Sequence, residues 1–147
     1  MREILFRGKR VDNGEWIKGY YCRFGWTGQE KHYIIPHYSS DGMPMEIDPD
    51  TVGQYTGLTD KNGVKIFEGD IVSYQFDNDD CPLPNKNTKK RIGRIFFSDW
   101  RASYSVTAGK NGCDSINTNL YGYVRNGNRV EVIGNIRDNP ELLEESK

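Results

Sequence analysis

Side chains able to act as nucleophiles or general bases are few in this chain, and they lie far apart. There are three cysteines, Cys22, Cys81 and Cys113, and two histidines, His32 and His37. Nucleophilic catalysis needs a nucleophile held beside a base, and known local motifs place a Ser or Cys between glycines at a strand-to-helix turn. None of these five residues lies in such a motif. The pattern is typical of small buried cysteines and ordinary surface histidines, so we expect the protein not to be an enzyme.

Metal and cofactor motifs are also missing from the sequence. Three aspartates fall within residues 77–80, but they run into Cys81-Pro82 instead of the central Gly and distal Glu of a calcium loop. His32 and His37 are five residues apart, which places them on opposite faces of a continuing strand. No glycine-rich phosphate-binding motif is present. We therefore expect no metal and no cofactor.

A basic segment gives one hypothesis for ligand binding. Cationic side chains recur over residues 86–94 and are followed by a Trp-Arg step: Lys86, Lys89, Lys90, Arg91, Arg94, Trp100 and Arg101. Small barrels bind nucleic acid by combining cationic grooves with stacking aromatic rings. Nearby aspartates reduce the local field, and a charged loop is usually just solvated. Weak nucleic-acid binding through the 86–94 segment is therefore the alternative predicted function.

Aromatic residues near the N-terminus give a second hypothesis. Tyr20, Tyr21, Trp26 and Tyr38 are candidates for an aromatic patch, because protein interfaces are enriched in Tyr and Trp. Core packing is the competing interpretation, and it suits Tyr20 or Tyr21 better than Trp26 in its Gly-flanked loop. Trp26 and Tyr38 are therefore the predicted protein-contact residues.

Composition narrows the class of protein. The 147 residues carry 20 basic and 21 acidic groups, a net charge of −1, and neither residues 1–56 nor residues 57–147 hold a basic excess. A dedicated DNA-coating protein normally shows such an excess, so any nucleic-acid contact must come from a local patch. Few Leu and Ala but 12% aromatic residues and 16 glycines favour strands and tight turns over helices.

Cysteine usage and hydropathy point to a cytoplasmic location. Three widely spaced cysteines form no disulfide framework. The N-terminus lacks an apolar run of signal-peptide length, and no stretch is long and apolar enough to span a membrane.

Short strands and tight turns dominate the predicted elements. Asn-Gly steps at residues 13–14, 62–63 and 126–127 favour hairpin turns. The Asp70 carboxylate, in the Glu-Gly-Asp turn, is expected to accept backbone N–H groups. Asn139 and Pro140 predict the start of a short helix over 141–145. We expect strands at residues 3–8, 15–21, 31–36, 51–56, 64–67, 71–76, 92–97, 102–107, 119–125 and 129–133, with loops at 22–30, 37–50 and 77–91.

Three stretches of the chain resemble the YopX family of phage and prophage proteins. The longest, residues 51–72, reads T-V-G-Q-Y-T-G-L-T-D-K-N-G-V-K-I-F-E-G-D-I-V and is similar to that family's signature. Residues 1–7 and 132–143 look like its two ends. The three matches bracket nearly the whole chain, whereas residues 77–91 and 98–120 carry no recognisable family pattern.

The resemblance implies a phage or prophage origin, and hence the cytoplasm of a bacterial host. It also implies a barrel of SH3-like type, and it implies no established activity or catalytic residue. We expect a mainly β fold with one domain over residues 1–147, a small SH3-like barrel at about 51–136, additional N-terminal hairpin strands and a short C-terminal helix. The predicted function is a phage accessory protein that acts as a non-catalytic interaction module. Its partner would be a host or phage protein, and self-association into a homo-oligomer is also compatible with the sequence.

Overall fold

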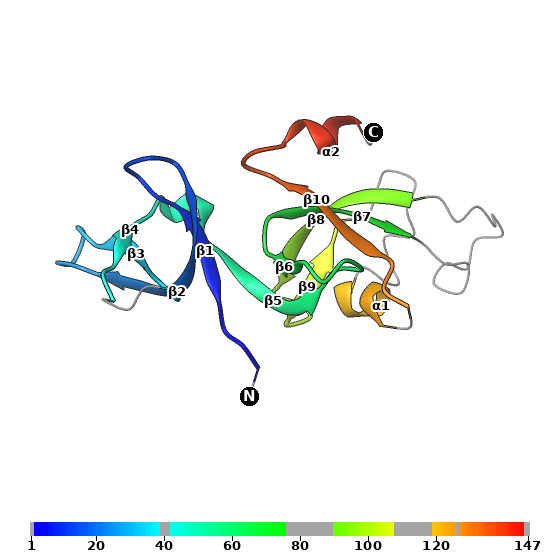
Figure 1. Ribbon diagram of the computed structural model, residues 1–147, viewed down its shortest axis with the longest axis horizontal. Coiled ribbons are helices and arrows are strands. Elements are labelled where there is room, and N and C mark those ends of the chain that lie inside the picture. Colours follow the sequence, from blue (N-terminus) through cyan, green and yellow to red (C-terminus); the bar gives the residue numbers. More distant parts are fainter. Residues whose placement is uncertain (1, 39–41, 76–89, 108–118, 126, 146–147) are drawn as a thin grey trace. The chain divides into compact units, whose positions relative to one another are not determined.

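The computed structural model describes residues 2–38, 42–75, 90–107, 119–125 and 127–145. The chain folds as two compact units, Met1–Gly57 and Leu58–Lys147 (Figure 1). The predicted barrel region, which begins near residue 51, therefore starts close to the boundary between the units. The prediction of a single domain over 1–147 stays a prediction.

The first unit is an antiparallel sheet built around one hairpin. Its strands are β1 (Phe6–Lys9), β2 (Trp16–Phe24), β3 (Lys31–Pro36) and β4 (Met45–Glu46), followed by the 3-10 helix η1 (Pro49–Thr51) and by β5 (Gly53–Thr59). The strand order is β4-β3-β2-β1-β5-β6, where β6 is Lys65–Phe67. Strand β5 crosses the boundary, since Leu58 and Thr59 belong to the second unit.

Glycines allow the close approaches in this sheet. Gly14 has φ 72° in the turn between β1 and β2, which confirms the predicted hairpin there. At Gly19 a Cβ would lie only 2.0 Å from the Ile35 carbonyl oxygen of β3. Only glycine therefore fits at this position without movement of the backbone.

A small apolar cluster holds the first unit together. It consists of Ile17, Ile34 and Ile47, with Phe6, Tyr21, Met45 and Val52 packed against it. The segment after β4 also returns to the end of β1. Arg10 and Ile47 form an antiparallel bridge, and the Asp48 N–H donates to the Lys9 carbonyl at 2.9 Å. The apolar cluster therefore packs against one face of the sheet formed by β1 to β4, and the opposite face lies outside this cluster.

The second unit has its own sheet and its own core. Its elements are β6, β7 (Asp70–Gln75), β8 (Lys90–Ser98), β9 (Ser103–Val106), α1 (Leu120–Val124), β10 (Val130–Asn135) and α2 (Glu141–Glu145). The antiparallel order is β10-β7-β8-β9. The buried cluster comprises Ile66, Val72, Tyr74, Ile95, Val106, Leu120, Tyr123 and Val130. Each unit thus has a separate hydrophobic core.

Two buried carboxylates fix turns of the second unit. Asp60 accepts the N–H groups of Asn62 and Val64 on Oδ1 and that of Val132 on Oδ2, at 2.8 to 2.9 Å. Asp70 accepts the Phe67 N–H at 2.8 Å, which confirms the predicted role of its carboxylate. Both aspartates are 3% exposed or less, so their charge is stabilised by backbone dipoles in place of water.

Several expectations about individual elements are corrected by the structure. Strand β2 runs to Phe24, beyond the predicted end at residue 21, and the predicted loop 37–50 contains β4 and the start of η1. Residues 120–124 form a helix, not a strand. Asn119 accepts the Tyr121 N–H on its side chain, and the turn buries Leu120 and Tyr123 on one face.

The mainly β prediction is confirmed, but its finer architecture differs. Over the residues that the structure describes, the strands form two antiparallel sheets and no closed barrel, because β6 pairs in the β5 sheet and leaves β9 and β10 as edges. The predicted C-terminal helix is present as α2. The Asn139 backbone carbonyl accepts the Leu142 N–H, while its side chain accepts the Asn135 N–H at 3.3 Å instead of capping the helix.

Candidate functional site

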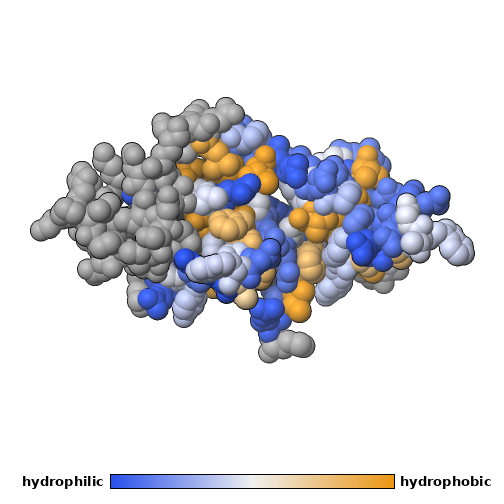
Figure 2. Space-filling view, turned by 180° about the vertical axis from the view of Figure 1, so that it is seen from behind, coloured by the Kyte–Doolittle hydropathy of each residue, from blue (hydrophilic) through white to orange (hydrophobic). Residues whose placement is uncertain are grey.

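The surface mixes apolar and polar side chains. On the face drawn in Figure 2, hydrophobic side chains lie in small patches separated by hydrophilic ones. Among the described residues, the most exposed aromatic side chains are Trp100 at 84%, Trp26 at 83% and Tyr38 at 69%. Single exposed rings are common on proteins, so the exposure of one ring does not by itself mark a binding site.

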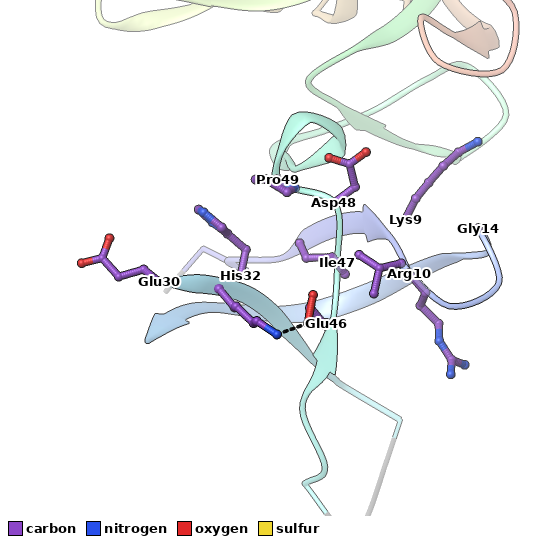
Figure 3. Close-up of a pocket in the computed structure, with 11 residues that line it drawn as sticks. Lys9, Arg10, Gly14, Glu30, His32, Glu46, Ile47, Asp48 and Pro49 are labelled. Carbon is purple, nitrogen blue, oxygen red and sulfur yellow. Dashed lines mark ion pairs between the residues drawn. The ribbon is translucent and has the colours of Figure 1, made fainter. Parts of the chain in front are cut away.

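One cavity of about 580 Å³ lies in the first unit, between the end of β1, the start of β3 and the segment after β4 (Figure 3). Its lining is strongly charged and comprises Lys9, Arg10, Val11, Gly14, Glu30, Lys31, His32, Glu46, Ile47, Asp48 and Pro49. The lining therefore combines charged side chains with Ile47 of the apolar cluster.

Most charged groups around this cavity already have partners. Lys31 forms an ion pair with Glu46 at 3.4 Å, and Asp48 accepts the Asp50 N–H at the start of η1. Arg10 forms an ion pair with Asp12 at 2.6 Å. His32 forms a 2.5 Å hydrogen bond between Nδ1 and the Tyr21 hydroxyl. These contacts shape the cavity and leave no obvious nucleophile in it.

The sheet beside this cavity presents a continuous outer face. Because side chains alternate along strands and partners in register share a face, the outward residues of β1 to β4 can be read from the pairing. We call them the outer face: Arg7, Lys9, Trp16, Lys18, Tyr20, Cys22, Phe24, Lys31, Tyr33, Ile35 and Glu46. The burial pattern agrees, since Ile17, Gly19 and Ile34 on the opposite side are buried.

Aromatic rings cluster toward the β2–β3 side of the outer face. Phe24 stacks on Tyr33 with centroids 4.4 Å apart and an interplanar angle of 11°. Phe24 is nevertheless 52% exposed, and Tyr20 on the same strand is 58% exposed. A flat ligand can therefore reach these two rings.

Cations cluster toward the β1 side of the same face. Arg7 and Lys9 lie over the Trp16 ring, at 4.8 Å and 5.3 Å from its centroid, within the range of cation–π attraction. Lys18 pairs in register with Arg7 and is exposed. Trp16 thus holds cations in place, while the rings of Tyr20 and Phe24 remain accessible.

The charges of the first unit are unevenly distributed. The outer face carries four cations, Arg7, Lys9, Lys18 and Lys31, and one acid, Glu46. The other described acids of this unit lie in the N-terminal segment, turns, loops and η1. A chain with net charge −1 therefore has a local sheet face of net charge +3.

The described cations of the basic segment predicted from sequence lie on two faces of β8. Lys86 and Lys89 lie outside the described residues. On β8, Lys90 and Arg94 share a face and are exposed, whereas Arg91 lies on the opposite side with Ile95. Lys90 also lines a small cavity of about 200 Å³ in which Lys61 pairs with Glu131 at 3.1 Å. The cations are thus divided between two sides of the strand.

The predicted Trp-Arg pair lies at the other end of the same strand. Trp100 and Arg101 are in the turn after β8, with the Arg101 guanidinium 5.0 Å from the Trp100 centroid. Eight residue steps separate Lys90 from Ser98, which is about 26 Å of strand. The Trp100–Arg101 pair therefore lies far along the strand from Lys90.

Trp26 and Tyr38 are also separated. Trp26 lies in the turn between β2 and β3, where its carbonyl accepts the Gln29 N–H, and Tyr38 follows the end of β3 with its ring against His37. Both are strongly exposed, as expected for contact residues. They lie at opposite ends of β3 and do not form the single aromatic patch considered from the sequence.

The outer face was not predicted from the sequence, although the alternation of residues in β2 indicates part of it. Residues 16–24 read W-I-K-G-Y-Y-C-R-F, in which every second residue from Trp16 to Phe24 points outward. The alternation was visible, but the strand was expected to end at residue 21. The contribution of β1 to the face depends on strand register, which has no local signature.

Possible metal-binding groups, free thiols and the length of the helices also bear on function in the described parts of the chain. No group of three His, Cys, Asp or Glu side chains that could hold a metal ion occurs among those residues. Cys22 is a free thiol on the outer face, while Cys81 and Cys113 lie outside the described residues. Within the same ranges, none of the helices has the length and apolar character needed to cross a bilayer.

Comparison with known proteins identifies the family of this mainly β protein. The family model described as YopX protein matches residues 5–144, so the chain belongs to the YopX family, as the sequence motifs predicted. The match spans both compact units. The structure is similar to the crystal structure of protein EF1440 from Enterococcus faecalis, with a TM-score of 0.54 and 27% sequence identity over 97% of this chain and 99% of that chain. No curated protein matches the chain in sequence.

Proposed function

We propose that this YopX-family protein is a non-catalytic phage or prophage accessory protein that binds a macromolecular ligand through the outer face of its first unit. The observation that carries the proposal is the joint placement of accessible rings and cations on one sheet face. Tyr20 and Phe24 of β2 are more than half exposed, Lys18 lies on the same strand, and Arg7 and Lys9 lie on the adjacent strand β1. Binding surfaces commonly combine aromatic anchors with charged neighbours.

The titratable groups of the core support a binding role over a catalytic one. The carboxylates of Asp60 and Asp70 accept hydrogen bonds from backbone N–H groups, most of them in their own turns. The His32 ring is hydrogen-bonded to the Tyr21 hydroxyl. A general base must reach a proton on a substrate. These carboxylates instead serve the fold, which supports the non-catalytic proposal.

Contact with a protein partner through Trp26 and Tyr38 is a second candidate function. The exposure of these side chains favours it, at 83% and 69%. Buried Trp and Tyr side chains often contribute most to protein interfaces. Because the two residues lie apart, each would anchor a different part of a partner, or only one of them would take part.

A matched pair of double variants tests the proposal. Tagged full-length protein is used to capture ligands from cells carrying the phage or prophage, with and without nuclease. The variant Tyr20→Ala/Phe24→Ala removes two exposed rings from the outer face, and Trp26→Ala/Tyr38→Ala removes two exposed rings outside it. We expect the first variant to lose the captured ligand and the second to retain it. The reverse result would overturn the proposal in favour of the second candidate.

A further inference from the structure

We propose that the outer face binds single-stranded nucleic acid with little sequence preference. This inference rests on the proposed function and names the class of ligand for the same surface. It places the nucleic-acid contact in the first unit, not in the basic segment 86–94 of the second unit.

The separation of charges on the first unit is the first observation behind this inference. Four cations and one acid face outward from β1 to β4, although the chain as a whole is slightly acidic. Asp12, in the turn beside this face, is neutralised by Arg10 at 2.6 Å. A local excess of fixed cations attracts phosphates and releases their counterions.

The arrangement of rings is the second observation. Tyr20 and Phe24 are four residues apart on β2, which is about 13 Å along the strand. Tyr33 backs the Phe24 ring in a parallel stack, so that one side of Phe24 is supported while the ring stays 52% exposed. Rigidly held rings of this kind stack unpaired bases without reading their identity.

Cations and rings follow one another along the same face. Arg7 and Lys9 lie on β1, in register with Lys18 and Trp16 of β2. The rings of Tyr20 and Phe24 continue along β2 toward β3. A single strand lying along the face would place phosphates against the cations at its β1 end and bases on the rings further along β2, which is the combination used by single-strand binding platforms.

The chemistry of the face favours a single strand over other occupants. Bases in a duplex are already stacked on each other, and groove reading normally needs a helix or a two-stranded ribbon that enters the groove. The cores of protein interfaces are depleted in lysine, whereas this face carries Lys9, Lys18 and Lys31. Unpaired nucleotides can stack their bases on the rings and place their phosphates against the cations.

Fluorescence anisotropy with a labelled oligothymidylate of about twelve nucleotides tests the inference, using the full-length protein over a range of salt concentrations. We expect binding that weakens steeply with salt. The variant Lys9→Gln/Lys18→Gln should make the slope of log K against log salt less negative by about 1.4, because each phosphate contact to a single strand contributes about 0.7. Tyr20→Ala/Phe24→Ala should weaken binding about tenfold or more.

Lys90→Gln/Arg94→Gln is the matched control, since it removes two exposed cations from β8 and should leave affinity and slope unchanged. Circular dichroism verifies that every variant is folded. The inference is overturned if the folded parent does not bind the oligonucleotide at low salt, if a duplex of equal length binds as tightly, or if the control variant weakens binding as much as the outer-face variants.

Failure of this inference can be distinguished from failure of the proposed function. If the oligonucleotide does not bind but a nuclease-resistant protein is captured and then lost with Tyr20→Ala/Phe24→Ala, the ligand is a protein and the outer face remains the binding surface. If neither ligand depends on the outer face, both proposals fail.

Discussion

Buried carboxylates show how single residues organise this fold. Asp60 is 3% exposed, and its carboxylate is held by three backbone N–H groups. The third donor, Val132, belongs to β10 and lies 72 residues further along the chain. One side chain therefore fixes its own turn and attaches that turn to a distant strand.

Replacement of Asp60 tests this role. In Asp60→Asn the remaining oxygen can still accept from Asn62 and Val64, but the new NH₂ group would face the Val132 N–H. Loss of one charge-assisted hydrogen bond and a buried unsatisfied donor should lower the free energy of unfolding by about 2 kcal/mol. Urea denaturation followed by circular dichroism measures the change. Asp99→Asn, at an exposed turn position, is the control and should shift stability by less than about 0.5 kcal/mol.

Asp12 gives a residue-scale prediction about pH. The hydrogen bond from the Arg10 guanidinium lowers the pKa of the Asp12 carboxyl below its ordinary value of 3.8. Because the folded-state pKa is lowered, the contact stabilises the fold above the ordinary value and is lost as pH falls through the lowered one. In Arg10→Gln the Asp12 pKa should rise toward the ordinary value, as measured by NMR titration of its carboxyl carbon. Lys18→Gln should not move it.

At the scale of elements, burial of side chains determined the secondary structure where local propensity was ambiguous. Residues 120–124, Leu-Tyr-Gly-Tyr-Val, contain residues that favour strands, but they form α1. The helix places Leu120 and Tyr123 three residues apart on one buried face, and the Asn119 side chain bonds the first turn. Packing of two large side chains into the core outweighs a weak local preference in so short a segment.

Two glycines of the second unit form a matched test of backbone strain. Gly63 has φ 82°, while Gly122 lies in α1 with ordinary φ, and neither has an atom within 4 Å of an added Cβ. Gly63→Val should destabilise the protein by roughly 1–3 kcal/mol, because a β-branched residue resists positive φ. Gly122→Ala should be neutral or stabilise by about 0.5–1 kcal/mol. Thermal denaturation compares them, and equal melting temperatures would contradict the turn assignment.

At the scale of the whole molecule, the described residues include a buried apolar cluster in each unit. Ile17, Ile34 and Ile47 form the cluster of the first unit, whereas the second unit buries a larger set around Tyr74 and Tyr123. The family match covers residues 5–144 and so spans both units. Because the two clusters share no residue, we expect damage to one of them to be felt mainly within its own unit.

Hydrogen exchange after Gly19→Ala tests this independence. The new Cβ would collide with the Ile35 carbonyl and should disrupt the pairing of β2 with β3. We expect faster amide exchange in β1 to β3 and nearly unchanged protection in β7 and β8, as measured by NMR or mass spectrometry. An equal loss of protection in both units would show that they unfold as one cooperative unit.

The sequence by itself determined the local features and the family. Asn-Gly steps specified the turns at Gly14 and Gly63, alternating residues located most strands, and the motif at residues 51–72 identified the YopX family. These features depend on the φ preferences and side-chain alternation of neighbouring residues, so they can be recognised without tertiary structure.

The tertiary structure decided which distant side chains share a surface. Arg7 and Lys9 meet Trp16 and Lys18 only because β1 and β2 pair in one register, and a shift by one residue would turn the rings of β2 inward. The same pairing rules divided Lys90, Arg91 and Arg94 between two faces of β8. Strand register is set by packing and by hydrogen bonds between strands, and no local sequence pattern reports it. The candidate site therefore became visible only when the strands were assembled into a sheet.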